Sequence, residues 1–341
     1  MRYTLLGNSG LRVSELCLGT ITFGDERSFG TPAADARAQL DMFAEAGGNF
    51  VDTASNYAKG NSEKVLGEVL PADRDHWVIG TKYTVSARPG DPNAAGNHRK
   101  NLVRSLEASL RSLRTDYIDL LWVHAWDDLT PVEEVMRALD DQVRAGKVHY
   151  IGISDAPAWV GAYGQAVAQF RGYSPLVALE VPYSLAKRDI ERELLPMARA
   201  MGLTVCAWEA LGAGLLSGKY VSGAVPNGAR RMGDQPAERV RLAEAVADVA
   251  RQAGVSSAQV ALSWLRSRGG VIPIVGARTP EQLADNLGCV DVALDEQALA
   301  RLDEVSAIDL GFPRAFLDAI TSLVHGAGVR ERIDVPRLFR R

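Results

Sequence analysis

A carboxylate, a phenol, an ammonium and an imidazole stand at related positions in this chain. Asp52, Lys82 and His124 each end a short apolar segment, and Tyr57 lies five residues after Asp52 in a small, polar loop. Taken singly, each has an ordinary structural explanation, such as a helix cap for Asp52 or a surface position for Lys82. Four reactive side chains at successive segment ends favour a shared chemical site.

These residue types suit the reversible protonation of a carbonyl oxygen. A free tyrosine has a pKa of about 10, which is too high for ready proton exchange near neutrality. A neighbouring ammonium stabilises the phenolate and lowers that pKa, and a carboxylate keeps the ammonium charged and oriented. We therefore expect Asp52 and Lys82 to tune Tyr57, while His124 donates a hydrogen bond to a substrate oxygen or relays a proton. This chemistry accompanies hydride transfer to a carbonyl carbon.

Eight short apolar segments, each followed by a helical pattern, would position these side chains. The segments are mostly unalternated, which is typical of parallel strands buried on both faces. The carboxyl ends of such strands meet on one rim, so Asp52, Lys82 and His124 would converge there. The expected strands cover 14–20, 49–51, 77–82, 117–123, 148–153, 176–179, 204–207 and 271–275.

Eight strand–helix units predict an α/β fold, a closed (β/α)8 TIM barrel, with an N-terminal β-hairpin (3–6 and 11–13) closing its bottom. An open, doubly wound sheet is the alternative, but residues 18–24 lack the glycine-rich turn that such sheets use for dinucleotides. No linker or composition break divides the chain. We therefore expect one domain over 1–341, with 1–15 as the bottom hairpin and 310–341 as a C-terminal tail.

Local signals predict where several helices begin. Asn61 or Ser62 is expected to cap the helix that follows Tyr57. Residues 130–133 form a capping-box pattern with proline at the first helical position, and residues 190–201 are expected to form one helix. Thr279 is expected to cap the helix after the eighth strand. Residues 212–233 form the longest irregular stretch.

The composition is that of an ordinary globular chain. It has 341 residues, a formal net charge of −4, 47% hydrophobic and 23% charged residues. The slightly acidic balance argues against nucleic acid or a membrane as a partner. Three scattered cysteines give no metal-ligand spacing, so no metal is expected. Together with the lack of an apolar leader segment, they indicate a cytoplasmic protein. The sequence leaves the oligomeric state open.

Several motifs, in this order and at these spacings, resemble the aldo-keto reductase superfamily over nearly the whole chain. They are residues 18–20, 52–54 with Tyr57, 80–82, 119–124, 152–154, 183–185, 214–220, and 272–276 with Gln282 and Asn286. The resemblance implies a barrel that binds NADPH in an extended form without a Rossmann domain. It also implies Tyr57 as proton donor or acceptor, Lys82 and Asp52 as its tuning pair, and His124 as the residue that orients the substrate.

The resemblance further implies how the cofactor lies. Trp208 would stack on the nicotinamide, Ser154 with its neighbours would hold the carboxamide, and residues 211–219 with Arg230 or Arg231 would cover the pyrophosphate. A physical argument adds that Arg278, beside a helix N-terminus, suits a 2′-phosphate, so NADP(H) is expected. The expected cofactor contacts are Gly19, Thr20, Ile21, Asp52, Ser154, Asp155, Glu180, Trp208, Glu209, Ala210, Leu211, Gly212, Lys219, Arg230, Gly276, Arg278, Gln282, Asp285 and Asn286.

The substrate is expected to be a small carbonyl or alcohol compound, such as an aldehyde, ketone or sugar. Its walls are expected to include Thr22, Phe23, Tyr83 and Trp126, with parts of the loops 84–98 and 221–236. These loops carry no motif, so the sequence predicts the class of reaction but not the substrate.

Three acids depart from the usual pattern of the superfamily, which often has asparagine, glutamine and serine where Asp155, Glu180 and Glu209 stand. If they are ionised, these carboxylates would favour the cationic, oxidised nicotinamide, and hence alcohol oxidation. The alternative is that one or more is protonated, or is paired with a base such as Lys187 or Arg188. The residues alone support both interpretations equally.

Two other functions fit part of this pattern. A cofactor-binding, redox-sensing partner subunit with weak catalysis is one alternative, but the complete set of four reactive residues favours an enzyme. A metal-dependent barrel hydrolase would need several histidines and aspartates at strand ends, and His124 is the only histidine there.

Overall fold

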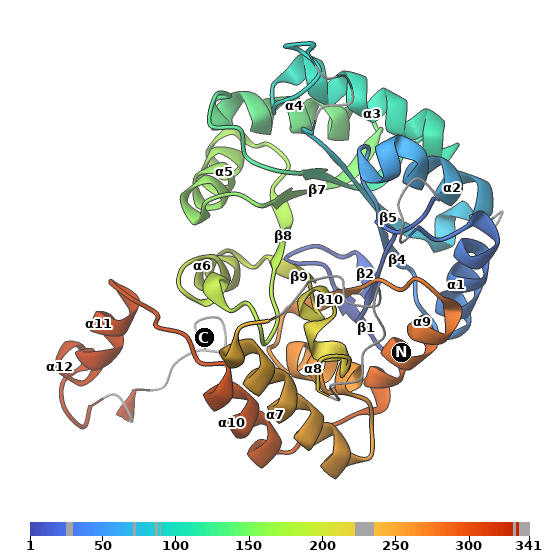
Figure 1. Cartoon of the computed structure of the whole chain (residues 1–341). Coiled ribbons are helices and arrows are strands. Elements are labelled where there is room, and N and C mark those ends of the chain that lie inside the picture. The colour runs from blue at the N-terminus through green and yellow to red at the C-terminus, as the bar shows by residue number, and fades with distance from the viewer. Residues whose placement is uncertain are drawn as a thin grey trace.

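The computed structural model describes residues 1–24, 30–70, 73–85, 88, 90–221, 235–329 and 332–333. Within these residues, eight parallel strands close into a barrel in the order β10-β3-β4-β5-β6-β7-β8-β9, with helices outside it (Figure 1). This confirms the predicted (β/α)8 barrel and excludes the open sheet. The strands are β3 (Cys17–Gly19), β4 (Phe50–Asp52), β5 (Val78–Tyr83), β6 (Ile118–Val123), β7 (Val148–Ser154), β8 (Leu176–Pro182), β9 (Thr204–Trp208) and β10 (Val271–Val275).

The predicted N-terminal hairpin is present and closes the bottom of the barrel. Its strands β1 (Tyr3–Leu5) and β2 (Arg12–Ser14) pair antiparallel, and Leu6 and Val13 are fully buried in the cluster that fills the barrel interior. The backbone N–H of Ser14 donates to Asn49 Oδ1 at 2.8 Å, directly before β4. The hairpin thus packs at the amino ends of the strands and leaves the carboxyl ends open for chemistry.

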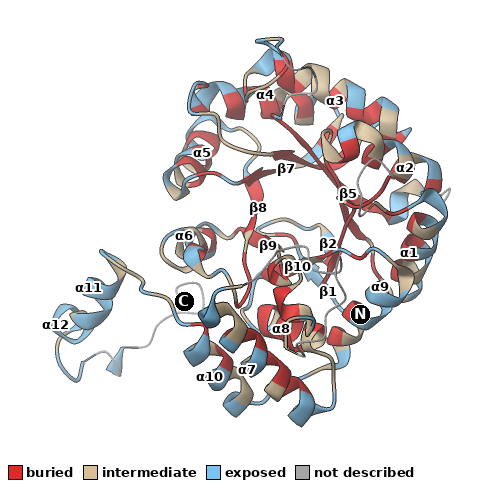
Figure 2. Ribbon diagram, in the orientation of Figure 1, coloured by how far each residue is buried: buried red, intermediate tan, exposed pale blue. Residues whose placement is uncertain are grey.

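The helices pack their apolar faces on the barrel, so burial is concentrated in the strands and the inner helix faces (Figure 2). The helices are α1 (Ala33–Glu45), α2 (Asn61–Val69), α3 (Arg99–Leu113), α4 (Val132–Arg144), α5 (Ala158–Arg171), α6 (Leu194–Met201), α7 (Ala237–Ala253), α8 (Ser257–Arg266), α9 (Pro280–Leu287), α10 (Glu296–Val305), α11 (Arg314–Ala319) and α12 (Thr321–His325). Short 3₁₀ helices are η1 (Tyr57–Gly60), η2 (Arg74–His76), η3 (Asp189–Glu191), η4 (Gly212–Ser217) and η5 (Gly288–Asp291).

The register of the strands decides which side chains enter the barrel. Asp52 pairs with Gly80, and Lys82 pairs with Trp122, so these inward positions lie next to one another. The Trp122 indole fills the interior below them. A Cβ atom at Gly152 would lie 2.4 Å from that indole, so the neighbouring strand must carry glycine there. Trp122 therefore forms an apolar floor beneath the carboxyl ends of β4 and β5.

Two of the predicted helix starts are wrong. The helix α2 begins after Gly60, whose φ is 90°, and Ser62 is no cap because its hydroxyl donates to Thr20 O at 2.8 Å. The capping box at 130–133 does not form either, because the Thr130 hydroxyl donates to Asp127 Oδ2 at 2.9 Å and α4 begins after Pro131. In both cases a tertiary or loop contact takes the hydroxyl that the local pattern assigned to the helix.

The single helix expected over 190–201 is also wrong, because it divides into η3 and α6. Pro196 lacks the N–H that would bond to Arg192, so a continuous α-helix is disfavoured there. The Thr279 cap, in contrast, is confirmed: its hydroxyl accepts the backbone N–H of Gln282, with Pro280 at the first helical position.

The C-terminal helices α11 and α12 stand away from the barrel in Figure 1, and neither has a buried residue. Part of the tail expected over 310–341 lies outside the described residues. Among the residues that are described, no helix has both the length and the apolar character needed to cross a membrane.

Candidate active site

The Lys82 ammonium lies at the centre of the carboxyl ends of the strands and is only 1% exposed. Its Nζ donates to Asp52 Oδ2, to Thr53 O at 3.0 Å and to Tyr57 Oη at 3.1 Å. Lys82 lies on β5, Asp52 ends β4, and Thr53 and Tyr57 lie in the segment after β4. Burial lowers the pKa of Lys82, but the charges of Asp52 and Glu180 more than offset this and hold it well above its usual value. Lys82 is therefore a permanent cation behind Tyr57.

Tyr57 is held by a tightly folded loop. The backbone N–H of Ser55 donates to Lys82 O, and the buried Ser62 hydroxyl lies 3.1 Å from that of Thr53. Directly after Tyr57, Ala58 and Lys59 adopt positive φ values of 46° and 55°. Two consecutive non-glycine residues in the left-handed region of backbone conformation are strained, and such strain is concentrated at functional sites.

The electrostatics of Tyr57 correct one sequence-based expectation. Burial raises its pKa, the Lys82 charge lowers it only in part, and the net shift is upward. The expected lowering by the ammonium is therefore present but does not dominate. Its hydroxyl is a proton donor at neutral pH, and the ammonium stands ready to stabilise the phenolate that forms when the proton leaves.

His124 lies beside Tyr57, with the two ring centroids 5.8 Å apart in an edge-to-face arrangement. Burial, and then the Lys82 charge, lower the pKa of His124 to about 3. His124 is therefore neutral near pH 7, with one ring N–H available as a donor.

This neutrality predicts that the ring of His124 does not titrate between about pH 5 and pH 9. Histidine ring signals followed by NMR against pH test it, with His124→Asn identifying the signal. A midpoint close to the ordinary value of about 6.5 would contradict the assignment of a neutral ring.

The three unusual acids occupy different environments. Glu180 Oε1 lies 3.2 Å from Lys82 Nζ, so this acid joins the buried cluster. Asp155 accepts the Trp208 indole N–H at 3.2 Å, and burial raises the pKa of Asp155 above its ordinary value. Glu209 Oε2 faces Lys187 Nζ at 3.9 Å, which matches the alternative of a paired base. Arg188 pairs with Glu191 and with Asp303, away from these acids.

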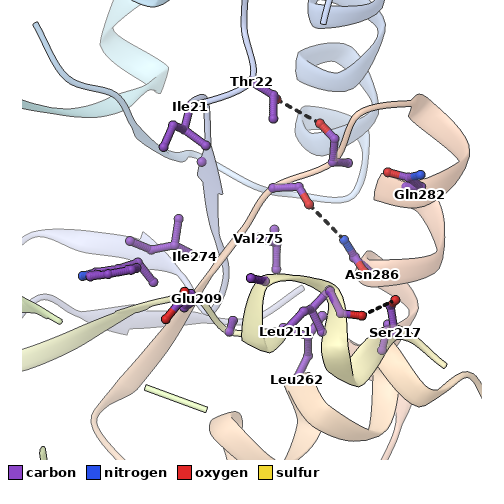
Figure 3. A pocket seen from close by; sticks show the side chains of 18 of the residues that line it. Ile21, Thr22, Glu209, Leu211, Ser217, Leu262, Ile274, Val275, Gln282 and Asn286 are labelled. Carbon is purple, nitrogen blue, oxygen red and sulfur yellow. Dashed lines mark hydrogen bonds between the residues drawn. The ribbon is translucent and has the colours of Figure 1, made fainter. Parts of the chain in front are cut away.

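A cavity of about 530 Å³ opens in front of Tyr57 and runs over the rim. Tyr57, His124 and Trp208 line it, together with the cations Lys219 and Arg278. Side chains from separate elements surround it (Figure 3): Ile21 and Thr22 after β3, Leu211 and Ser217 before α7, Leu262 on α8, and Gln282 and Asn286 on α9.

The strap (residues 211–219, which contain η4) forms one wall of this cavity. Ala213 and Gly214 have φ values of 55° and 96°, so the strap turns sharply there. Opposite it, the Asn286 amide donates to Gly276 O at 3.4 Å, and the Gln282 side chain accepts the backbone N–H of Arg278 at 3.0 Å. These contacts fix the start of α9 and the backbone of Arg278 beside the cavity, where a guanidinium suits an anion.

Most of the expected site residues line this cavity. Those that do are Gly19, Ile21, Asp52, Tyr57, His124, Ser154, Asp155, Glu180, Trp208, Glu209, Ala210, Leu211, Lys219, Gly276, Arg278, Gln282, Asp285 and Asn286. Lys82 lies directly behind them. Arg230 and Arg231 fall outside the described residues, as does most of the loop 221–236.

Five expected contacts do not line the cavity. Thr20 and Phe23 are fully buried, and the Thr20 hydroxyl donates to Asp52 O at 3.0 Å. The Tyr83 hydroxyl donates to Asn97 O at 3.2 Å, away from the rim. Trp126 packs on the core instead, and Gly212 is a buried residue of the strap. Phe23, Tyr83 and Trp126 were inferred from strand-end position alone, which does not specify the direction of a side chain.

Other lining residues were not anticipated from the sequence. Ala258 and Leu262 are four residues apart on α8 and face the cavity. Their spacing on one helix face was a usable signal. Tyr220, Ile274 and Val275 also line the cavity; they lie in the motifs 214–220 and 272–276 but were not predicted as contacts. Among the described residues, no cluster of three or more histidine, cysteine or acidic side chains has the arrangement of a metal site.

Comparison with known proteins identifies relatives along almost the full chain. The model of the Aldo/keto reductase family matches residues 15–307. A norsolorinic acid reductase of Emericella nidulans is 43% identical over 320 residues, which cover 91% of this chain and 82% of that protein. One from Aspergillus flavus is 38% identical over 325 residues, covering 92% and 83%. A putative aryl-alcohol dehydrogenase of Saccharomyces cerevisiae is 34% identical over 328 residues, covering 91% and 87%.

Proposed function

Because the chain belongs to the aldo/keto reductase family and is an oxidoreductase of carbonyl and alcohol groups, we propose that it uses NADP(H), with Tyr57 as general acid and base. The observation that carries the proposal is the Lys82 ammonium 3.1 Å from the Tyr57 hydroxyl, backed by Asp52 and opening onto the large cavity. That arrangement has one evident chemical use, which is to move a proton at the cavity wall.

The residues around the cavity fit a nicotinamide dinucleotide. Lys219 and Arg278 bring two cations to the cavity lining, which suit the phosphates. Trp208, held by Asp155, supplies a flat ring, and Ser154 lines the same cavity. When bound, the dinucleotide would supply or accept the hydride at the substrate carbon.

The remaining steps belong to the side chains of this protein. In the direction of reduction, Tyr57 gives its proton to the substrate oxygen, and the Lys82 ammonium stabilises the phenolate that remains. Asp52 keeps that ammonium in place. The neutral His124 ring donates a hydrogen bond that positions the substrate oxygen. In oxidation the Tyr57 phenolate takes the alcohol proton through the same contacts.

An aromatic aldehyde, or the corresponding aryl alcohol, is the substrate class that we propose. The Tyr57 and His124 rings line the cavity in an edge-to-face arrangement, and an aromatic substrate ring packs favourably against such a wall. The relatives named as aryl-alcohol dehydrogenases agree with this class.

The proposal is tested by mixing the purified protein with NADPH and para-nitrobenzaldehyde and following NADPH consumption. We expect turnover, and a higher kcat/KM than for a linear aldehyde of similar size. Tight binding of NADPH without turnover of any aldehyde or alcohol would instead favour the cofactor-binding, redox-sensing subunit.

Arg278 provides a prediction on the choice of cofactor. Replacing Arg278 with alanine removes a guanidinium that suits the 2′-phosphate, so the Kd for NADPH should rise about tenfold. Titration of intrinsic fluorescence with each dinucleotide measures this. NADH, which lacks the phosphate, serves as the internal control and should bind both proteins alike. A parallel loss of affinity for NADH would show that Arg278 supports the fold of the site instead.

A further inference from the structure

The buried Lys82 ammonium is shared by two acids, one more than its charge can balance. Asp52 contacts Nζ from β4, and Glu180 Oε1 lies 3.2 Å from it on β8. Asp52 is 3% exposed and Glu180 is 2% exposed. With all three groups ionised, the cluster would carry a net negative charge without water to solvate it, and such charges are costly.

The hydrogen bonds of the cluster also indicate one acid more than the Lys82 ammonium can satisfy. An ammonium has three N–H donors, and those of Lys82 go to Asp52 Oδ2, Thr53 O and Tyr57 Oη. Glu180 is a fourth polar contact of this ammonium, at 3.2 Å. In the described part of the chain, Asp52 Oδ1 and Glu180 Oε2 are both buried without a hydrogen-bond partner. A proton on either carboxyl group would provide the missing O–H donor and remove the excess charge.

Among the residues that the structure describes, the groups acting on Glu180 include no second cation. The titratable groups that face it are Asp52 on β4, Lys82 on β5, Tyr57 in the loop after β4, Asp155 after β7, and the thiols of Cys17 on β3 and Cys206 on β9. Lys82 alone among these carries a positive charge, and the neighbouring His124 ring is neutral. Burial, and then the Asp52 charge, raise the pKa of Glu180 well above its ordinary value.

We propose that Asp52 and Glu180 hold one proton between them at neutral pH, and that its loss at higher pH strengthens binding of NADP+ relative to NADPH. The second half rests on the proposed function. The proton leaves to solvent and the cluster changes from neutral to a net charge of −1. The oxidised nicotinamide is cationic and the reduced ring is neutral, so a negative Glu180 in the cavity wall favours the oxidised form.

Both interpretations of Glu180 that the sequence left open, a protonated acid and an ionised carboxylate, then apply at different pH values. At neutral pH the shared proton keeps the cluster of Asp52, Lys82 and Glu180 without net charge. As the pH rises, Glu180 becomes the carboxylate that favours alcohol oxidation. The chain would thereby couple the preferred direction of hydride transfer to pH through a nearly buried group in the cavity wall.

A binding experiment tests the coupling. The Kd values of NADP+ and NADPH are measured by fluorescence titration from pH 6 to pH 9 in the wild type and in Glu180→Gln. The ratio of the NADPH Kd to the NADP+ Kd is expected to rise about tenfold with pH in the wild type and to stay level in Glu180→Gln. A level ratio in the wild type, or a rise that survives in Glu180→Gln, overturns the coupling.

Glu63→Gln is the matched control. Glu63 is also a buried acid, its carboxylate accepts the Thr81 hydroxyl at 2.6 Å, and it does not line the cavity. The rise in the Kd ratio should persist in this variant. If Glu63→Gln abolished the rise as well, the effect would not be specific to Glu180 and the proposal would fail.

Infrared difference spectroscopy of the protein without cofactor tests the proton itself. The carbonyl stretching band of a protonated carboxylic acid should be lost in Glu180→Gln and equally in Asp52→Asn, because a single remaining carboxylate pairs with Lys82 and ionises. A band that persists in both variants, or its absence from the wild type at neutral pH, overturns the shared proton. If the protein failed to bind NADP(H), the proposed cofactor and the coupling would both be contradicted. The infrared band would still show whether Asp52 and Glu180 share a proton.

Discussion

Replacing Tyr57 with phenylalanine is expected to lower kcat by about a thousandfold for both reduction and oxidation. The phenol is the group that the geometry places between the Lys82 ammonium, 3.1 Å from its hydroxyl, and the cavity. A general acid or base contributes roughly 10²- to 10⁴-fold, and the substitution removes only the oxygen. Steady-state kinetics with an aromatic aldehyde and NADPH measures the loss, and fluorescence titration should show a nearly unchanged Kd for NADPH.

Tyr117→Phe is the matched control for this substitution. Its hydroxyl donates to Asp75 at 2.7 Å and lies just before β6, at the opposite end of the barrel from Tyr57. The same chemical change there should leave kcat unaltered. If Tyr57→Phe kept more than about a tenth of the wild-type kcat, another group would be the principal proton donor.

Replacing Lys82 with methionine is expected to abolish most activity and to lower the free energy of unfolding by about 3–5 kcal/mol. Methionine fills a similar volume but leaves Asp52 and Glu180 buried without a cation. The cost of such uncompensated charge exceeds that of lost packing, so both carboxyl groups would be forced to take up protons in the folded state. Urea-induced unfolding measured at two pH values quantifies this effect.

The pH dependence of this variant has a definite sign. In the folded state the pKa values of Asp52 and Glu180 are raised, whereas in the unfolded chain they return to about 4. The folded state then binds more protons, so the stability of Lys82→Met should fall as the pH rises from about 5 to 8. Adding Glu180→Gln to Lys82→Met removes one of the two buried acids and should restore part of the stability. Equal stability at both pH values, with no recovery in the double variant, would contradict the account of the cluster.

The class of fold and the reactive residues were readable from the sequence for one physical reason. Strands buried on both faces leave continuous apolar segments, and in a parallel barrel the residue that ends each segment must reach the same rim. Asp52, Lys82 and His124 were found by that rule. The Thr279 cap followed from local chemistry, because its hydroxyl accepts the backbone N–H of Gln282, whereas the same Thr-Pro pattern at Thr130 failed because Asp127 takes that hydroxyl.

Contacts between distant segments were decided only by the tertiary structure. The sequence could not show that Glu180 and Asp52 meet on one ammonium, because that contact depends on the register of β8 and β4 in a closed barrel. Nor could it show that burial outweighs Lys82 in raising the pKa of Tyr57, since desolvation depends on the atoms that surround a group in space. The sequence by itself thus determined which ionisable groups meet at the rim of the barrel. The packing of the barrel determined the charge that each one bears before the reaction begins.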